Sequence, residues 1–178
     1  MRKQSFPPVI DERARVLIMG SLPGDASLQI QEYYGNPRNY FWTVVYALFS
    51  DGAAPEADYP RRLAFAAQNH LALWDVIAAG EREGSLDANI KAELPNAIPE
   101  LLAAYPGIRC LAFNGSKAHD TFMKHFRHHP CTEGRAVLKL PSTSPIPTPR
   151  MRGAADRIEA WRPIVGYARG EGELRQGD

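Results

Sequence analysis

The sequence predicts a three-layer α/β/α domain with a four-stranded, mostly parallel central sheet. Short apolar runs typical of strands covered on both faces alternate with segments whose apolar residues recur at helical spacing. Strands that alternate with helices in this way form parallel sheets between two helical layers. A length of 178 residues suits a single domain, whose core we place at residues 14–167, with a polar tail at 168–178.

Each predicted strand is a short stretch rich in aliphatic residues. The first is continuously apolar and ends at Gly20, as expected of a central strand. The four predicted strands cover residues 16–19, 71–77, 108–113 and 136–140. In open sheets of this type ligands bind at the carboxyl ends of the strands, so the loops that follow them are the first candidates for a site.

Helical periodicity and turn residues define the segments between the strands. The clearest helix has Phe41 and Val45 on one face and places Asn39 in or before its first turn. Helices are predicted at residues 27–34, 38–50, 61–69, 95–104, 116–126 and 151–167. Residues 1–13 are expected to lie on the surface, and residues 80–90 to form a polar connection.

Composition and charge narrow the classes of function. The chain has 21 basic and 20 acidic residues, and a net charge of +1 provides no overall positive field for nucleic acid. Any phosphate binding would therefore need a local patch. The start of the chain lacks the apolar stretch of a signal peptide, and no segment is long enough to span a bilayer. We expect a cytoplasmic protein that does not bind membranes.

Cysteines and histidines do not predict a metal site. Cys110 and Cys131 provide neither a disulfide framework nor a zinc-binding spacing. His125, His128 and His129 lie near Cys131 but have no neighbouring carboxylate, so we interpret them as solvated or phosphate-facing. No metal or other cofactor is expected.

Polar and aromatic loops follow three of the predicted strands. They are GSLPG with the later YYGNPRNYFW, then FNG, then LPSTSP. Taken alone, Asn39 is typical of a helix cap, Asn114 of a turn, and Tyr34 and Phe41 of core aromatics. At one sheet edge, however, two asparagines and an aromatic ring can hydrogen-bond and stack on a planar heterocycle.

These loops resemble the successive motifs of a known family. GSLPG, YYGNPRNYFW, FNGSKA and LPSTSP are similar to the motifs of the uracil-DNA glycosylase superfamily, in particular its hypoxanthine-DNA (deoxyinosine) glycosylase branch. The resemblance covers roughly residues 14–165 and includes the LWDVI and GSLD segments. It implies a metal-free enzyme of DNA base-excision repair that flips a deaminated base, hypoxanthine or also uracil, and hydrolyses its N-glycosidic bond to leave an abasic site.

The chain departs from the better-known branches at two positions. Leu22 stands where uracil-specific relatives have an aspartate or asparagine that orients water, and Leu140 stands where they have a histidine or asparagine that donates to the departing base. Asn39 matches the asparagine of the Asn-x-Phe-Trp segment of the hypoxanthine branch, and Asn114 matches that of its Phe-Asn-Gly segment. The resemblance therefore implies that Asn39 and Asn114 are the catalytic residues.

We expect the base to be read by side chains and amides from these loops. Asn39 would hold water against the anomeric carbon, and Asn114 would offer a donor and an acceptor to the base. Tyr34 would stack on the base, with Phe41 also at the base-binding site. Backbone amides of the first turn would help to bind the base or a phosphate, and the residues concerned are Ser21 and Gly24.

The last loop is expected to hold DNA. Its hydroxyl residues are Ser142, Thr143 and Ser144, with help from Arg150 and Arg152. Arg157 and Arg162, which follow, are expected to be solvated on the last helix. Ile146 and Met151 are our candidates for a wedge that fills the gap left by the flipped base. A monomer suits a protein that wraps one lesion.

Two acids and two lysines are candidates for other chemistry. Asp25 is expected to lie on the surface or to cap a helix, and Asp75 to orient the asparagines, although both are alternatives for activating water. Lys117 and Lys139 fit exposed positions on a helix and a strand, so no lysine is expected to form a Schiff base. We therefore expect hydrolysis of the N-glycosidic bond without cleavage of the DNA strand, which is the activity of a monofunctional glycosylase.

Other functions remain open at this stage. A uracil-specific or mismatch-specific DNA glycosylase would have the same architecture. A non-catalytic α/β module that binds a nucleotide or nucleic acid would explain Leu22 and Leu140. A nucleoside hydrolase would leave the proline-rich loop at 141–149 without a purpose. Base release from inosine-containing or uracil-containing duplexes separates these possibilities.

Overall fold

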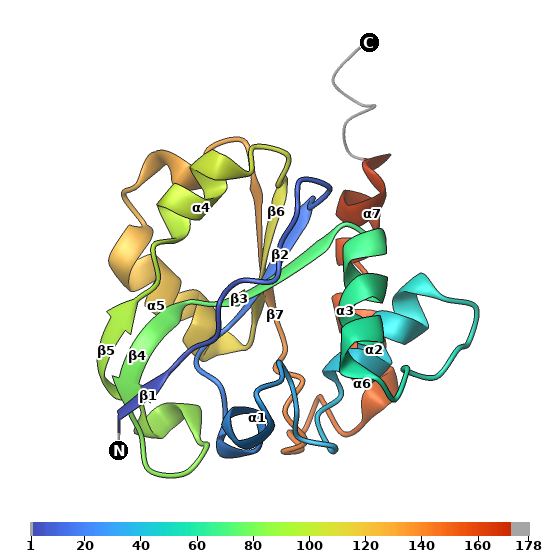
Figure 1. Ribbon diagram of the computed structural model, residues 1–178, viewed down its shortest axis with the longest axis horizontal. Coiled ribbons are helices and arrows are strands. Elements are labelled where there is room, and N and C mark those ends of the chain that lie inside the picture. Colours follow the sequence, from blue (N-terminus) through green and yellow to red (C-terminus); the bar gives the residue numbers. More distant parts are fainter. Residues whose placement is uncertain (1, 172–178) are drawn as a thin grey trace.

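The central sheet contains four parallel strands. The computed structural model describes residues 2–171, and the sheet consists of β2 (Val16–Gly20), β3 (Leu71–Asp75), β6 (Cys110–Asn114) and β7 (Ala136–Leu140). Their order is β3-β2-β6-β7, and every neighbouring pair is parallel (Figure 1). The predicted fold class is confirmed. All residues of β2 are buried, as its apolar sequence requires.

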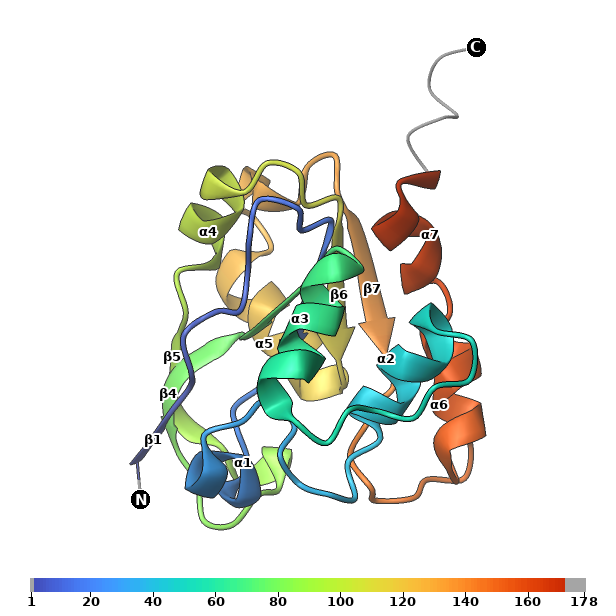
Figure 2. The same ribbon diagram turned by 45° about the vertical axis from the view of Figure 1, so that its right-hand side comes forward.

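Helices cover both faces of this sheet (Figures 1 and 2). One face carries α2 (Phe41–Phe49), α3 (Tyr59–Gln68), α6 (Ala154–Trp161) and α7 (Ile164–Arg169), and the other carries α4 (Ile98–Ala104) and α5 (Ser116–Phe126). Side chains of β2 alternate between the two cores: Val16 and Ile18 pack under α2, whereas Leu17 and Met19 pack under α4 and α5.

A second, antiparallel sheet was not predicted. It contains β1 (Arg2–Gln4), β4 (Ile77–Glu81) and β5 (Lys91–Pro95) in the order β1-β4-β5. The predicted strand at 71–77 therefore divides at Val76, where the amides of Val76 and Ile77 donate to Gly20 and Ser21. Within the segment expected on the surface, residues 2–4 form β1 and Lys3 is buried, although the other described residues up to 13 are exposed or half-buried. The connection expected at 80–90 includes the end of β4 and the η1 turn at 87–89.

Prolines account for two further differences. The helix predicted at 95–104 begins at Ile98, because Pro95 is the last residue of β5. The helix predicted at 151–167 consists of α6 and α7, and Pro163 lies between them, where its missing N–H ends helical hydrogen bonding. Ala168 is buried within α7, so the tail begins later than predicted, and residues 172–178 of it lie outside the described residues.

Three short helices complete the described chain. They are α1 (Asp25–Ile30), η1 (Asp87–Asn89) and η2 (Pro130–Thr132). Both α1 and η1 lie beside the carboxyl edge of the central sheet, at the bottom of Figure 1. Within residues 2–171 no helix is long and apolar enough to cross a membrane.

Candidate active site

A cavity of about 410 Å³ opens at the carboxyl edge of the central sheet. Its walls come from the turn after β2, the segment before α2, the loop around η1, the end of β6 and the loop after β7. These include the three loops that follow the predicted strands, together with the η1 loop, which contains the GSLD segment at residues 84–87. Parallel strands bring the loops together because their carboxyl ends lie at the same edge.

Asn39 lies in the cavity wall immediately before α2. Its Oδ1 accepts a hydrogen bond from the Phe41 amide at 2.9 Å, so the side chain stabilises the turn into the helix. An amide oxygen has two acceptor positions and an amide nitrogen two donors, which leaves one acceptor and the NH₂ group for a ligand. The Tyr40 amide donates to Thr143 O at 2.9 Å, which joins this segment to the loop after β7.

Asn114 ends β6 and is held by a single residue. Its Nδ2 donates to Thr143 Oγ1 and its Oδ1 accepts from the Thr143 amide, both at 2.9 Å. Asn114 is 8% exposed and Thr143 only 1%, so this pair is shielded from water. The reciprocal bonds fix the orientation of the Asn114 amide and leave it one donor and one acceptor. Thr143 therefore holds the Asn114 side chain inside the protein, whereas the sequence predicted that Thr143 contacts DNA.

Tyr34 lies in the cavity wall with two other aromatic residues, Phe6 and Tyr33, and Phe41 lies behind it. The two rings stack with centroids 3.8 Å apart and an interplanar angle of 24°. Phe41 is fully buried and packs edge-on against Trp42 and Trp161. The structure thus places Phe41 where it can orient Tyr34 from outside the cavity lining.

Both unusual leucines are core residues. Leu22 is 6% exposed and packs with Ile77 and Ile90, which belong to the region of the second sheet. Leu140 is also 6% exposed and belongs to the core under α2 and α6. Apolar side chains at these two positions stabilise the fold because their apolar surface is removed from water.

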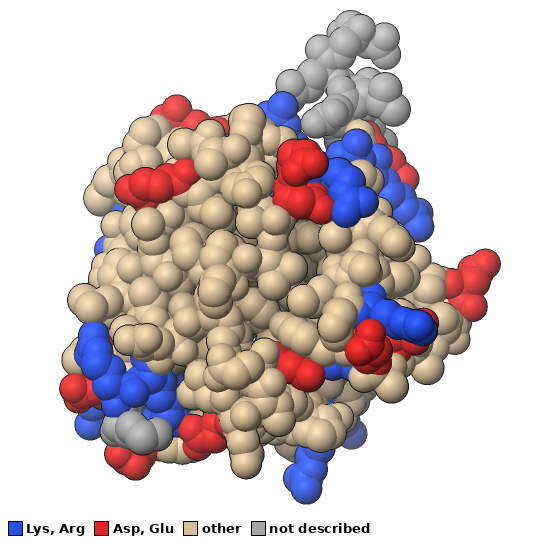
Figure 3. Space-filling view, in the orientation of Figure 1, with Lys and Arg blue, Asp and Glu red and all other residues tan. Residues whose placement is uncertain are grey.

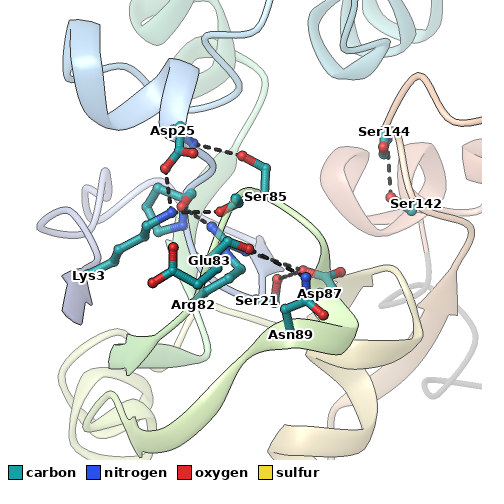
Figure 4. A network of polar contacts seen from close by, with 12 residues as sticks. Lys3, Ser21, Asp25, Arg82, Glu83, Ser85, Asp87, Asn89, Ser142 and Ser144 are labelled. Carbon is teal, nitrogen blue, oxygen red and sulfur yellow. Dashed lines mark hydrogen bonds and ion pairs between the residues drawn. The ribbon is translucent and has the colours of Figure 1, made fainter. Parts of the chain in front are cut away.

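Buried cations support the turn after β2 (Figure 4). Lys3 pairs with Asp25 and donates to Gly84 O at 2.6 Å, while Arg82 donates to Pro23 O. Arg82 also lies 3.8 Å from Asp87 Oδ1, the atom to which Ser21 Oγ donates at 2.6 Å. Lys3 and Arg82 are 4% and 2% exposed. The sequence offered no signal for them, because Lys3 lies in a charged N-terminal segment and Arg82 between acidic residues.

Gly24 lies in the cavity wall, whereas Asp25 does not. The Asp25 amide donates to Ser85 Oγ at 3.0 Å, and a side chain added at Gly24 would meet the same Ser85 at 3.3 Å. Asp25 is exposed, as predicted, and it pairs with Lys3. It is the first residue of α1 and does not cap the helix with its side chain.

Arg157 organises the loop after β7. Its guanidinium donates to the carbonyls of Ser142, Gly153, Ser144 and Ile146, at 3.1, 2.9, 2.9 and 3.3 Å. It lies over the Tyr40 ring, 4.5 Å from the centroid, and is 1% exposed. The expectation that Arg157 is solvated is wrong. The available signal was its position one helical turn before Trp161, on the buried face of α6.

The remaining loop residues divide between cavity and surface. Ser142 and Ser144 lie in the cavity wall, and the Ser144 amide donates to Ser142 Oγ at 3.1 Å (Figure 4). Ile146 lies at the same wall and is 56% exposed, as a wedge would be. Arg150 and Arg152 are exposed beyond the cavity lining. Met151 is half-buried, and its amide donates to Thr148 O at 3.2 Å.

Asp75 is a buried acid in the cavity wall, 5% exposed. Within residues 2–171 its Oδ2 has no hydrogen-bond partner, and neither has the Tyr34 hydroxyl. Burial, and less strongly the Asp87 carboxylate, raise the pKa of Asp75 to about 7 against the opposing effect of Arg82. Burial and Asp75 raise the pKa of Tyr34, although the nearby Asn114 amide opposes this shift.

The histidine and cysteine cluster has a structural use. His129 Nδ1 accepts from the Cys131 amide at 3.0 Å and caps η2. In the part of the chain that the structure describes, no group of three histidine, cysteine or acidic residues is placed to hold a metal ion.

Comparisons with known proteins show the family to which this chain belongs. The model of the uracil DNA glycosylase superfamily matches residues 7–165. Two curated hypoxanthine DNA glycosylases, from Methanosarcina barkeri and Methanosarcina acetivorans, are 42% and 43% identical over 120 residues, which are 67% of this chain and 75% of each relative. A solution NMR structure of a Methanosarcina acetivorans protein described as a candidate uracil DNA glycosylase is 35% identical, with a TM-score of 0.76 over 95% of this chain and 99% of that one. The chain belongs to the uracil-DNA glycosylase superfamily.

Proposed function

We propose that this protein is a monofunctional DNA glycosylase that releases hypoxanthine from deoxyinosine in DNA and leaves an abasic site. One observation carries the proposal: the Asn39 and Asn114 amides lie in the walls of one cavity at the sheet edge, beside a loop of exposed serines. Two relatives at 42% and 43% identity are named hypoxanthine DNA glycosylases.

A base inside a duplex is out of reach of such a cavity, so the target nucleotide must leave the stack. The loop after β7 is placed to hold the strand, because Ser142 and Ser144 lie beside the cavity and Arg157 fixes their carbonyls. Ile146 at the exposed rim is positioned to occupy the opened base step.

Phosphate contacts come from a small part of the surface. Basic and acidic residues are interspersed on the face shown in Figure 3, without one continuous basic patch. The net charge of +1 agrees with this distribution. Arg150 and Arg152 are exposed next to the serine loop and supply local positive charge. Binding should therefore depend on salt through only a few phosphates.

The chemistry needs a positioned water and a stabilised leaving base. As the bond from C1′ to the base stretches, the sugar becomes positively charged and the base negatively charged. Asn39 retains an acceptor that can hold water against C1′, which is a positioning effect because an amide is no base near neutral pH. Asn114 retains a donor and an acceptor for the base, in an orientation fixed by Thr143.

The test uses end-labelled duplexes that contain one inosine, one uracil or no damaged base. We expect the protein to act on the inosine duplex without added metal, and strand scission to appear only after alkali. Faster release of uracil would make the protein a uracil glycosylase, as the description of the NMR relative suggests. Scission without alkali would contradict a monofunctional enzyme, and no product from either damaged duplex would favour a binding module.

A further inference from the structure

The proposed function gives the departing base one donor, the Asn114 amide, and the inference that follows, which rests on that function, adds a second. Leu140 is part of the core and cannot donate a hydrogen bond. Three polar atoms of the cavity wall have no hydrogen-bond partner within residues 2–171, namely Asp75 Oδ2, the Tyr34 hydroxyl and Arg82 Nε. The Arg82 guanidinium already donates to Pro23 O and lies near Asp87. For Asp75 and Tyr34 a ligand is the natural partner, because buried polar groups without partners are rare in proteins.

Gly20 allows these two groups to approach each other. Gly20 and Asp75 are partners in neighbouring parallel strands. A Cβ added to Gly20 would lie 2.8 Å from Asp75 Oδ1 and 3.5 Å from the Tyr34 hydroxyl. The Asp75 backbone is fixed, because its carbonyl accepts from Asn96 Nδ2 at 2.7 Å. The carboxyl and the hydroxyl therefore both lie close to Gly20, in space that a larger residue would occupy.

The protonation state of Asp75 decides what it can bind. Hypoxanthine presents an N1–H donor next to the O6 acceptor. A neutral carboxyl presents an acceptor and a donor at matching positions, whereas a carboxylate only accepts and would face O6 with like charge. A donor at O6 also becomes more favourable as negative charge develops on the base, which lowers the barrier.

We propose that Asp75, as a neutral carboxylic acid, pairs with the N1–H and O6 edge of hypoxanthine and stabilises the departing base, assisted by the Tyr34 hydroxyl. The water oxygen forms the new bond to C1′, and the electron pair of the broken C1′–N9 bond goes to the base. The water releases one proton to solvent and the base takes one up, so the Asp75 proton stays on the carboxyl as a hydrogen-bond donor.

The surroundings of Asp75 support a neutral form near pH 7. The groups that face it are Asp87 from η1, Arg82 from the loop after β4, and the hydroxyls of Tyr33 and Tyr34. Burial and Asp87 disfavour the carboxylate, and Arg82 favours it, with a resulting pKa of about 7. Burial and Asp75 raise the pKa values of Tyr33 and Tyr34, which therefore remain protonated donors.

The experiment is single-turnover excision from an inosine duplex between pH 5.5 and 9, with Asp75→Asn and Asp75→Leu. We expect the wild-type rate to fall about tenfold per pH unit above neutrality. Asp75→Asn keeps a neutral donor and acceptor, so it should act within about tenfold of wild type below pH 7 and lose the alkaline decline. Asp75→Leu should lose roughly 100-fold at pH 6. Asp51→Asn, an exposed change after α2, should keep the wild-type profile.

Two results would overturn the assignment. A wild-type rate that rises through pH 7, with Asp75→Asn inactive, would make Asp75 a base for water. An alkaline decline that persists in Asp75→Asn would place the titrating group elsewhere. Both require an active wild-type protein, whereas a wild type that releases neither hypoxanthine nor uracil would instead overturn the proposed function. Thermal melting of each variant separates loss of activity from loss of folding.

Discussion

The two walls of the cavity are built by different physical means. The first wall, which we call the neutral wall, is formed by β6 and the loop after β7. It is held by hydrogen bonds between Asn114 and Thr143 and by those that Arg157 donates to four neutral carbonyls. The opposite wall, which we call the ionic wall, is formed by the turn after β2 and the η1 loop. It is held by ion pairs of the buried Lys3 and Arg82.

This difference suggests a division of labour. The neutral wall fixes the positions of amides and hydroxyls, which matters for orienting the base and the water. The ionic wall places charges around Asp75 and so controls which protonation state faces the base. Substitutions in the neutral wall should change the excision rate or the free energy of unfolding. Substitutions in the ionic wall should change how these two quantities depend on pH.

The largest effect on stability at a fixed neutral pH is expected from Arg157→Met. It leaves four carbonyls of the 142–153 loop without their buried donor, and we expect the free energy of unfolding to fall by about 3 kcal/mol in urea titrations. Arg162→Met, at the residue that follows the same helix, removes only an exposed pair with Glu159 and should leave stability almost unchanged. Equal effects of the two changes would contradict the scaffolding role.

Asp75→Asn should also change how stability depends on pH. The folded-state pKa of about 7 lies above the ordinary value, so the favourable contribution of the protonated Asp75 is complete below about pH 4 and is lost as pH rises through 7. From pH 4 to 8 the wild type should therefore lose about 4 kcal/mol relative to Asp75→Asn. A constant difference across this range would show that Asp75 is not titrating as described.

Thr143→Val tests the neutral wall alone. It removes the hydroxyl that accepts from Asn114 Nδ2 but keeps the shape, at a cost of about 1 kcal/mol in stability. We expect the excision rate to fall about tenfold through misorientation of Asn114, with no change in the pH midpoint. Thr43→Val, on the exposed side of α2, is the control. A shift in the pH midpoint of the excision rate would contradict the proposed division of roles between the two walls.

Asp87→Asn tests the ionic wall and has the smallest expected effect. The amide oxygen can still accept from Ser21, but the charge that disfavours the Asp75 carboxylate is gone. The pKa of Asp75 should fall, and the alkaline decline in excision should move to lower pH by about half a unit. A shift to higher pH would contradict this electrostatic account.

The sequence predicted the neutral wall better than the ionic one, for a physical reason. Continuous apolar runs identify buried parallel strands, and parallel strands place the loops of Asn39 and Asn114 at one edge. The second sheet left no such pattern: β4 is IAAGE and β5 is KAELP, without regular alternation, and Lys3 pairs with residues over twenty positions away. Long-range pairing of charges is not encoded in local periodicity.

Within the site, residue types were predicted better than their contacts. Asn39 and Tyr34 lie in the cavity wall as their motifs suggested, but Phe41 lies behind Tyr34 and Thr143 faces Asn114. Spacing on a helix shows which face a residue occupies, but it does not show whether a neighbouring ring comes between that residue and the cavity.

The most direct test of the whole account is single-turnover excision of hypoxanthine by Asn39→Ala, measured alongside binding of the same inosine duplex. We expect the rate to fall at least about 1,000-fold with binding unchanged, because the water loses its positioning group while the DNA-holding loop is intact. Asn69→Ala, at the end of α3 and away from the cavity, should act like wild type. Excision by Asn39→Ala at the wild-type rate would contradict the central claim.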